Sequence, residues 1–145
     1  MGTRRGSNDK LDVIYDCYQN GWGFITQEFY DKAEQYAAHI HSLEMIKKLR
    51  TPVPELKAYL KEQALGVQKI QVFFRDMELR AEMLKSFSKE FSDLVVTTSI
   101  VNNIDFNSRE ATKGIALKKL AAYLDIPLSQ TMAFGDDTND VSMLK

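Results

Sequence analysis

The sequence has little of what marks specialised protein classes. One cysteine, Cys17, cannot form an internal disulfide, and three prolines and seven glycines are too few for a collagen-like or low-complexity chain. No apolar run approaches the roughly 20 residues that span a bilayer, and the polar start lacks the apolar stretch of a signal peptide. Nineteen Lys and Arg against twenty Asp and Glu leave a net charge of −1, so no basic field points to nucleic acid or an anionic membrane. These absences favour a cytoplasmic protein without nucleic-acid or membrane partners.

What is present is the composition of an ordinary globular chain. Hydrophobic residues make up 44% and charged residues 27% of the 145 residues, which is one domain's worth of chain. Residues 1–7 are small, basic and without pattern, so we interpret them as a tag or cloning remnant and leave them out of the fold prediction. Without Arg4 and Arg5 the net charge falls from −1 to −3, so the body of the chain is mildly acidic.

Turn and periodicity signals divide the chain into alternating strands and helices. The pair Asn20-Gly21 between two runs of strand-forming residues predicts a β-hairpin over residues 11–25, since both turn positions need positive φ. Apolar residues at helical spacing predict a helix from residue 27 into the forties with Thr26 as its N-cap, and Pro54 and Gly66 bracket a short helix. Further strands are expected at residues 68–74, 94–100 and 132–134, and the last of these is expected to be buried. Further helices are expected at residues 76–91, 114–124 and 139–144. Residues 102–108 are expected to form a connector or a short strand. This alternation predicts an α/β or α+β fold.

The segment with the most chemical content is the turn Gly135-Asp136-Asp137-Thr138-Asn139-Asp140. It follows an apolar run at the carboxyl end of a predicted strand, which is where open α/β sheets place their sites. Carboxylates clustered before a helix suit a hard cation such as Mg²⁺, which takes oxygen ligands. Helix capping by Asp or Asn explains the same residues without a metal, and from this segment alone both interpretations stand.

A second feature is Lys113, directly before the helix predicted at residues 114–124. A lysine at a helix start is unfavourable for the helix dipole unless an anion lies nearby, because the helix N-terminus and the ammonium would then both attract that anion. On its own, the residue is better explained as a solvated surface lysine.

Together the two segments resemble the C-terminal signature of the haloacid dehalogenase (HAD) superfamily, and within it the Cof-type sugar-phosphate phosphatases. The motifs lie in residues 105–144: Lys113-Gly114 before an Ala-Leu helix, Leu124-Asp125-Ile126, and Gly135-Asp136 with Asn139-Asp140 and Met143-Leu144. Residues 11–103 fit the α/β cap of that family by pattern alone. The resemblance implies a HAD-type α+β cap domain over residues 8–103 and a partial Rossmann-like core over residues 104–145.

The resemblance also implies roles for four residues. Lys113 matches the catalytic lysine that binds the transferred phosphoryl group, and Asn139 matches a phosphate-binding asparagine. Asp136 matches a Mg²⁺ ligand, and Asp140 matches the second acidic position, which supports the loop and the metal. In the family reaction an aspartate forms an aspartyl-phosphate that water then hydrolyses, with Mg²⁺ and a lysine stabilising the charge. The implied substrate is a small phosphorylated metabolite such as a sugar phosphate.

The most consequential departure from the family pattern concerns the nucleophile. The Asp-x-Asp-x-Thr motif that carries the family's nucleophile does not occur in the sequence. We therefore expect a cap with a piece of the core, cut from a larger enzyme and inactive on its own. The alternative is a non-catalytic, cap-like module that binds a ligand or another chain. A truncated core also predicts an exposed strand edge at residues 132–134, through which a homodimer could form.

Overall fold

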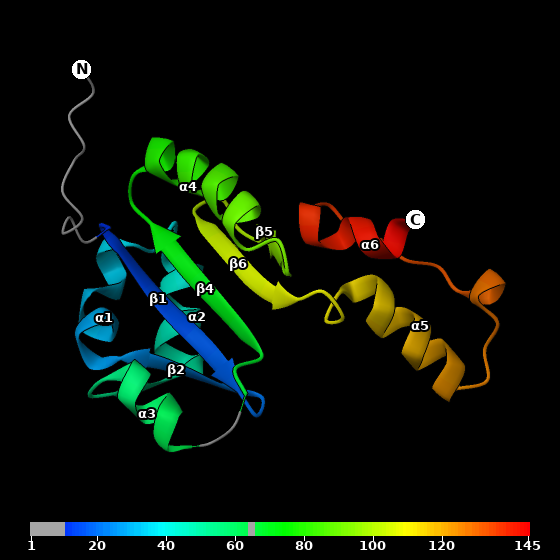
Figure 1. Ribbon diagram of the computed structural model, residues 1–145, viewed down its shortest axis with the longest axis horizontal. Helices are drawn as coiled ribbons and strands as arrows, with labels where there is room; N and C mark the ends of the chain where they lie inside the picture. The colour runs from blue at the N-terminus through cyan, green and yellow to red at the C-terminus, as the bar shows by residue number, and fades with distance from the viewer. Residues whose placement is uncertain (1–10, 64–65) are drawn as a thin grey trace.

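The computed structural model describes residues 11–63 and 66–145. Within these ranges the strands form one six-stranded mixed sheet in the order β3-β2-β1-β4-β6-β5. The strands are β1 (Val13–Gln19), β2 (Trp22–Thr26), β3 (Arg50–Val53), β4 (Lys69–Phe74), β5 (Leu94–Thr97) and β6 (Asn103–Ser108). The helices are α1 (Gln27–Lys32), α2 (Ile40–Leu49), α3 (Leu56–Glu62), α4 (Met77–Glu90), α5 (Lys113–Tyr123) and α6 (Val141–Leu144), with 3-10 turns η1 (Ala33–Gln35), η2 (Leu128–Gln130) and η3 (Thr138–Asp140). Figure 1 shows the sheet and its covering helices as one lobe, with α5 and α6 set apart from it. None of the helices in the two described ranges has the length and apolar character of a membrane span.

The hairpin predicted at Asn20-Gly21 is confirmed. Strands β1 and β2 pair antiparallel with Gln19 opposite Trp22, and the two turn residues have φ of +51° and +79°. Glycine adopts such a φ without steric cost, and asparagine tolerates it better than most residues. The Gly21 amide also donates a hydrogen bond of 2.8 Å to Gln68 Oε1. The turn is thereby tied to the chain that enters β4, the other neighbour of β1.

Two hydrophobic clusters hold helices on opposite faces of the sheet. On one face, Ile14 of β1 and Phe73 of β4 are buried against residues of η1 and α2. On the other face, Cys17 of β1 is buried against Leu56 of α3, and Phe106 of β6 packs against one aromatic ring of α4 and one at its C-cap. Successive side chains of a strand point to opposite faces, so the odd and even positions of β1 serve the two clusters separately. The sheet is therefore a central layer with helices on both sides.

The prediction of a single helix from residue 27 into the forties is wrong. The chain forms α1, η1 and α2, with a break at residues 36–39. Contacts with distant residues stabilise the break: Tyr36 Oη donates to Asp12 Oδ1 at 2.5 Å, and the Tyr36 carbonyl accepts from the buried Asn102 Nδ2 at 2.6 Å. The side chain of Thr26 makes no capping hydrogen bond to α1, and α2 begins at a cap of its own, His39. Local periodicity cannot reveal such a break, because the compensating partners come from elsewhere in the sequence.

Two strand boundaries also differ from the prediction. Residues 50–53, for which no strand was predicted, form the edge strand β3, parallel to β2. Pro52 is tolerated there because an edge strand can leave one N–H position unpaired. The strand expected over residues 94–100 ends at Thr97. Asn103 Oδ1 accepts hydrogen bonds from the amides of Ser99 and Ile100, at 3.0 and 3.1 Å. These bonds hold the turn that leads directly into β6. Of the two predicted alternatives for this segment, a connector or a short strand, residues 103–108 form the strand.

The buried strand expected at residues 132–134 is not formed. These residues have no strand partner, and Met132 and Phe134 are 80% and 81% exposed. A strand needs a neighbour that pairs with its backbone groups, and this segment lies beyond α5, away from the sheet (Figure 1). The strand edge on which the homodimer prediction rested is therefore absent from the described residues.

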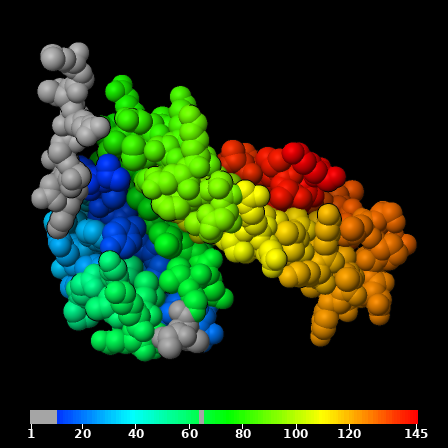
Figure 2. All heavy atoms as spheres, in the orientation of Figure 1, coloured from blue at the N-terminus to red at the C-terminus, as the bar shows by residue number. Residues whose placement is uncertain are grey.

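The C-terminal segment is held together by close packing of α5 on α6. The Gly114 amide donates to Ser142 Oγ at 3.0 Å, and a Cβ on Gly114 would lie 2.0 Å from the Ser142 carbonyl oxygen. Glycine is needed here because of this close approach. In the space-filling view the segment projects from the sheet lobe and joins it beside β6 (Figure 2).

Candidate active site

A polar cleft of about 150 Å³ lies between the sheet and the segment that carries α5 and α6. Polar residues from both sides line it: Lys69, Thr97, Asp105 and Asn107 from the sheet, and Thr112, Lys113, Thr138, Asn139 and Ser142 from the C-terminal segment. Two of the four predicted site residues, Lys113 and Asn139, therefore share one cleft. Asp140 lies behind Lys113 and Asp136 is on the exposed part of the loop, so neither is among the residues that line it.

Asp140 organises the acidic loop. Its Oδ2 accepts hydrogen bonds from the backbone amides of Asp136 and Asp137, at 3.1 and 3.3 Å, and its Oδ1 forms an ion pair with Lys113 Nζ. The Lys113 ammonium, helped by the two amides and opposed by burial, lowers the pKa of the Asp140 carboxyl. A Cβ on Gly135 would lie 2.3 Å from Asp140 Cβ. The glycine of the motif is thus required so that Asp140 can fold back under the loop.

The other side of the loop is fastened to the sheet. Thr138 Oγ1 donates to the Thr98 carbonyl at 3.1 Å, and the Thr98 amide donates to Thr138 Oγ1 at 3.3 Å. Asp137 accepts from the Thr138 amide at 2.6 Å and forms a capping box with Asp140 at the start of η3. The contacts between Thr98 and Thr138 were not predicted from the sequence, because they join residues forty positions apart. They fix the acidic loop against the end of β5.

Capping therefore accounts for two of the three carboxylates in the loop, and Asp136 remains. Its side chain is exposed and has no hydrogen bond or ion pair with the described residues. No group of three His, Cys, Asp or Glu side chains in the described ranges is arranged to hold a metal ion. Mg²⁺ is bound by oxygen ligands in near-octahedral geometry, and these residues offer it one free carboxylate. By themselves they do not fit a complete Mg²⁺ site.

Lys113 is the first residue of α5, and Thr112 caps the helix by accepting from the Ile115 amide at 3.2 Å. The Lys113 side chain is 49% exposed, and its ammonium contacts the nearly buried Asp140 carboxylate. The anion that makes a lysine favourable at a helix start is therefore present within the chain. The ammonium stands at the cleft wall with part of its surface open to a second anion.

The sheet side of the cleft was not predicted as part of a site. Asp105, on β6, is 1% exposed. Its Oδ1 accepts from Gln71 Nε2 at 3.0 Å and from Asn103 Nδ2 at 2.9 Å, and its Oδ2 lies 3.1 Å from Lys69 Nζ. The strand pattern offered a signal for Gln71, which shares its face of β4 with the buried Phe73, where polar side chains are uncommon. It offered none for Asp105, whose neighbours on the same face of β6 are also polar.

A buried ion pair continues this network across the sheet. Arg50 Nη2 donates to Gln71 Oε1 at 2.9 Å, and Arg50 Nε donates to Asp16 Oδ2 at 2.6 Å. The side chains of Arg50 and Asp16 are both fully buried. Burial outweighs the attraction of Arg50 and raises the pKa of Asp16 to about 6. A chain of hydrogen bonds thus runs from β1 and β3 through β4 to Asp105 at the cleft.

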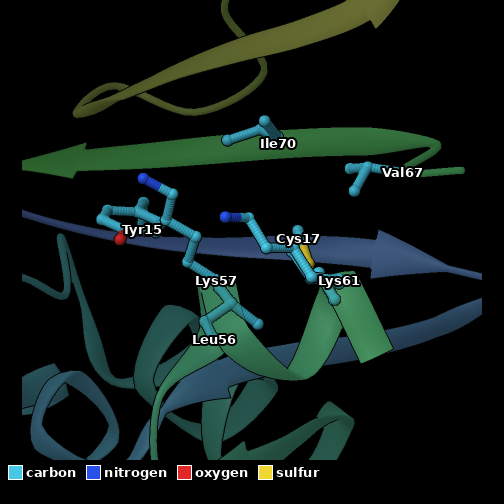
Figure 3. Close-up of a pocket in the computed structure, with 8 residues that line it drawn as sticks. Tyr15, Cys17, Leu56, Lys57, Lys61, Val67 and Ile70 are labelled. Atoms are coloured by element: carbon cyan, nitrogen blue, oxygen red, sulfur yellow. The ribbon is translucent and has the colours of Figure 1, made fainter. Parts of the chain in front are cut away.

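A larger groove of about 340 Å³ lies on the opposite face of the sheet, between α3 and the strands β1 and β4 (Figure 3). It is lined mainly by apolar side chains, among them Tyr15, Leu56 and Ile70, with lysines of α3 at its margin. Cys17 is the thiol among its lining residues, and burial raises the pKa of that thiol to about 11. A protonated thiol is a poor nucleophile. The smaller polar cleft is therefore the better candidate for chemistry.

Comparison with known proteins agrees with the motifs. The profile of the haloacid dehalogenase-like hydrolases matches residues 7–145. The phosphatase YwpJ of Bacillus subtilis is 51% identical over 53 residues, which cover 37% of this chain and 19% of that protein. The 5-amino-6-(5-phospho-D-ribitylamino)uracil phosphatase YcsE of the same organism is 34% identical over 70 residues, 48% of this chain and 28% of that protein. The HMP-PP phosphatase of Yersinia pseudotuberculosis is 37% identical over 68 residues, 47% of this chain and 24% of that protein.

Solved structures show the same relationship. A haloacid dehalogenase-like hydrolase from B. subtilis aligns with a TM-score of 0.70 and 26% identity over 91% of this chain and 52% of its own. A subclass IIB sugar phosphatase of the superfamily aligns with a TM-score of 0.60 over 91% of this chain and 45% of its own, at 16% identity, which is a likeness of fold alone. The chain thus spans about half the length of these structures, and its alignments cover less than a third of the curated relatives above. The resemblance seen in the motifs is confirmed: the chain belongs to the haloacid dehalogenase-like hydrolases.

Proposed function

We propose that this chain supplies the phosphate-binding wall of a phosphatase that hydrolyses small phosphorylated metabolites. One observation carries the proposal: Lys113 and Asn139, from separate segments, meet at one polar cleft, and Asp140 holds the ammonium in place. The three curated relatives described above are all phosphatases, which supports the same reaction class. We keep a sugar phosphate as the expected substrate type, because the motifs of residues 105–144 resemble those of the Cof-type sugar-phosphate phosphatases.

The assigned roles follow from the position of each group. The Lys113 ammonium neutralises charge on the transferred phosphoryl oxygens, and the Asn139 amide donates a hydrogen bond to them. Asp140 positions Lys113 and keeps the loop closed through the amides of Asp136 and Asp137. Asp136 is the carboxylate left for a cation. Because one carboxylate binds Mg²⁺ weakly, we expect this chain alone to bind the ion only at high concentration.

The division of labour between the two parts follows the fold. We assign the sheet lobe to the cap and the segment with α5 and α6 to the core. Strand β6 continues to Ser108, so the boundary expected between residues 103 and 104 falls within it. We place the division in the connection between Ser108 and Lys113, where no sheet pairing is broken.

Phosphate release from an aryl phosphate and a panel of sugar phosphates, with Mg²⁺, tests the proposal. The chain alone should release none, since it lacks the nucleophile motif. Activity is therefore measured in a chimera in which residues 109–145, which follow β6, replace their counterpart in the phosphatase YwpJ. Lys113→Met should lower kcat of the chimera by roughly 100-fold, the typical loss for one group that stabilises transition-state charge. Lys119→Met, an exposed lysine on the same helix, is the matched control and should leave kcat unchanged.

Two results would contradict this assignment. A Lys113→Met chimera with unchanged kcat would show that the ammonium does not meet the phosphoryl group. Phosphate release by the chain alone, abolished by Asp136→Asn, would show that a nucleophile is present within these 145 residues and that the expected inactivity is wrong.

A further inference from the structure

We infer that Asp105 and Thr97, on the sheet side of the cleft, form a subsite that selects phosphate esters whose leaving group carries a hydroxyl group. The inference rests on the proposed function, because it places the phosphate at Lys113 on the opposite wall. Asp105 and Thr97 would determine specificity, in addition to Lys113 and Asn139, which bind the phosphate.

Asp105 has one satisfied oxygen and one that lacks a well-directed hydrogen bond. The amides of Gln71 and Asn103 both donate to Oδ1. Oδ2 is buried, has Lys69 Nζ at 3.1 Å, and receives no hydrogen bond of good geometry. Nearly all buried polar atoms in folded proteins have such a partner. Asp105 Oδ2 is therefore a negatively charged acceptor that lacks a well-directed donor and belongs to a residue lining the cleft. A ligand hydroxyl group could supply that donor.

Thr97 provides a second oxygen beside the first. It pairs with Asp105 across the β5–β6 ladder, so the two side chains lie on the same face of the sheet. Its Oγ1 is buried and has no hydrogen-bond partner among the described residues, and the residue lines the cleft. A hydroxyl group both donates and accepts. It can therefore donate to Asp105 and exchange a hydrogen bond with Thr97 at the same time.

The network behind Asp105 fixes its orientation. The Gln71 oxygen accepts from Arg50, so the Gln71 amide group has only its N–H side to offer to Asp105. Arg50 in turn is held by its ion pair with Asp16. Buried ion pairs contribute little to stability compared with apolar residues of similar volume. The role that we assign to this network is to orient Asp105 rather than to stabilise the fold. Arg50 and Gln71 are therefore positioning residues.

The charges of the cleft decide which leaving groups fit. Lys69 and Lys113 both line it, so a cationic group would meet like charge. An apolar group would leave the buried oxygens of Asp105 and Thr97 without partners, and sites built for hydrogen bonding discriminate strongly against such groups. A neutral hydroxyl group satisfies both oxygens. One hydrogen bond to a charged acceptor corresponds to about a tenfold preference in affinity.

Titration calorimetry of this chain with three probes tests the inference: glycerol 3-phosphate, propyl phosphate and inorganic phosphate. Glycerol 3-phosphate should bind about tenfold more tightly than propyl phosphate, which has the same carbon chain without hydroxyl groups. Thr97→Val and Asp105→Asn should each bring that ratio close to one. Thr97→Val removes no hydrogen bond of the described structure, so it should also keep the wild-type unfolding midpoint. Thr51→Val, at an exposed strand position, is the control.

The outcomes separate the two proposals. If wild-type protein binds glycerol 3-phosphate no better than propyl phosphate, or if the folded Thr97→Val protein keeps the full preference, the subsite is refuted. The phosphate assignment is read independently from Lys113→Met, which should weaken all three probes equally. If that variant leaves inorganic phosphate binding unchanged, the proposed function fails, whatever the ratio between the two esters.

Discussion

The buried ion pair between Arg50 and Asp16 gives the sharpest test of how this fold is held together. In Arg50→Met, the aliphatic stem is replaced by one of similar length and the guanidinium is lost. The Asp16 carboxylate then stays fully buried without the 2.6 Å hydrogen bond from Nε. Gln71 also loses the 2.9 Å bond from Nη2. We therefore expect the free energy of unfolding to fall because one charge is left uncompensated.

The magnitude follows from complete burial. Removal of one partner from a buried ion pair typically costs about 3–5 kcal/mol, and the loss of the bond to Gln71 adds about 1 kcal/mol. A total of about 5 kcal/mol corresponds to a fall of roughly 15 °C in Tm for a chain of this size. Replacement of both partners, Asp16→Leu with Arg50→Met, leaves no buried charge. The double variant should recover to within about 1 kcal/mol of the wild type.

Urea unfolding followed by far-UV circular dichroism measures all four proteins of this cycle. The reasoning is refuted if Arg50→Met costs less than about 1 kcal/mol, because the pair would then be solvated. It is equally refuted if the double variant is destabilised by the sum of the single losses, since independent sites add and coupled ones do not.

Three further predictions concern single positions. Burial raises the folded-state pKa of Asp16 from 3.8 to about 6. Its contribution to stability is therefore fully present below pH 4 and is lost as the pH rises through 6. Relative to Asp16→Asn, the wild type should lose roughly 2 kcal/mol between pH 4 and 7 in urea titrations, and parallel pH profiles would contradict this. Gly135→Ala should lower the free energy of unfolding by about 1–3 kcal/mol, because its Cβ displaces Asp140, and an unchanged urea midpoint would show that the loop accommodates it. Gly21→Ala should lower the free energy of unfolding by about 1 kcal/mol, because φ of +79° is strained for alanine. A thermal midpoint equal to that of the wild type would contradict this.

The site was predictable from the sequence only where its residues are neighbours in the chain. The loop from Gly135 to Asp140 carries its own capping, glycine and carboxylate signals. Pairing of that loop with Lys113 came from the resemblance to a family, and the structure places the Lys113 ammonium on Asp140. Asp105 escaped notice as a site residue, because its position in the cleft depends on β6 being the neighbour of both β4 and β5.

Among the elements, those with strong local signals were predicted well. The hairpin at Asn20-Gly21 is set by two residues that tolerate positive φ. The helix over 77–90 begins where Asp76 caps it, accepting from the amides of Glu78 and Leu79. The helix over 113–123 likewise begins at its own Thr112 cap. Each signal acts within one helical turn or one β-turn, so the sequence contains it in full.

The sequence by itself determined the hairpin, most helix starts, the acidic loop and the class of the fold, because the interactions responsible join residues a few positions apart. Only the tertiary structure decided where the long helix breaks at Tyr36 and that residues 132–134 stay outside the sheet. The same holds for the meeting of Lys113 and Asn139 with Asp105. In each case the deciding partner is distant in sequence: Asn102 for the break, a missing strand neighbour for the apolar run, and the order of the strands for the cleft. Buried polar groups must find partners wherever the chain brings them, and no local pattern contains that information.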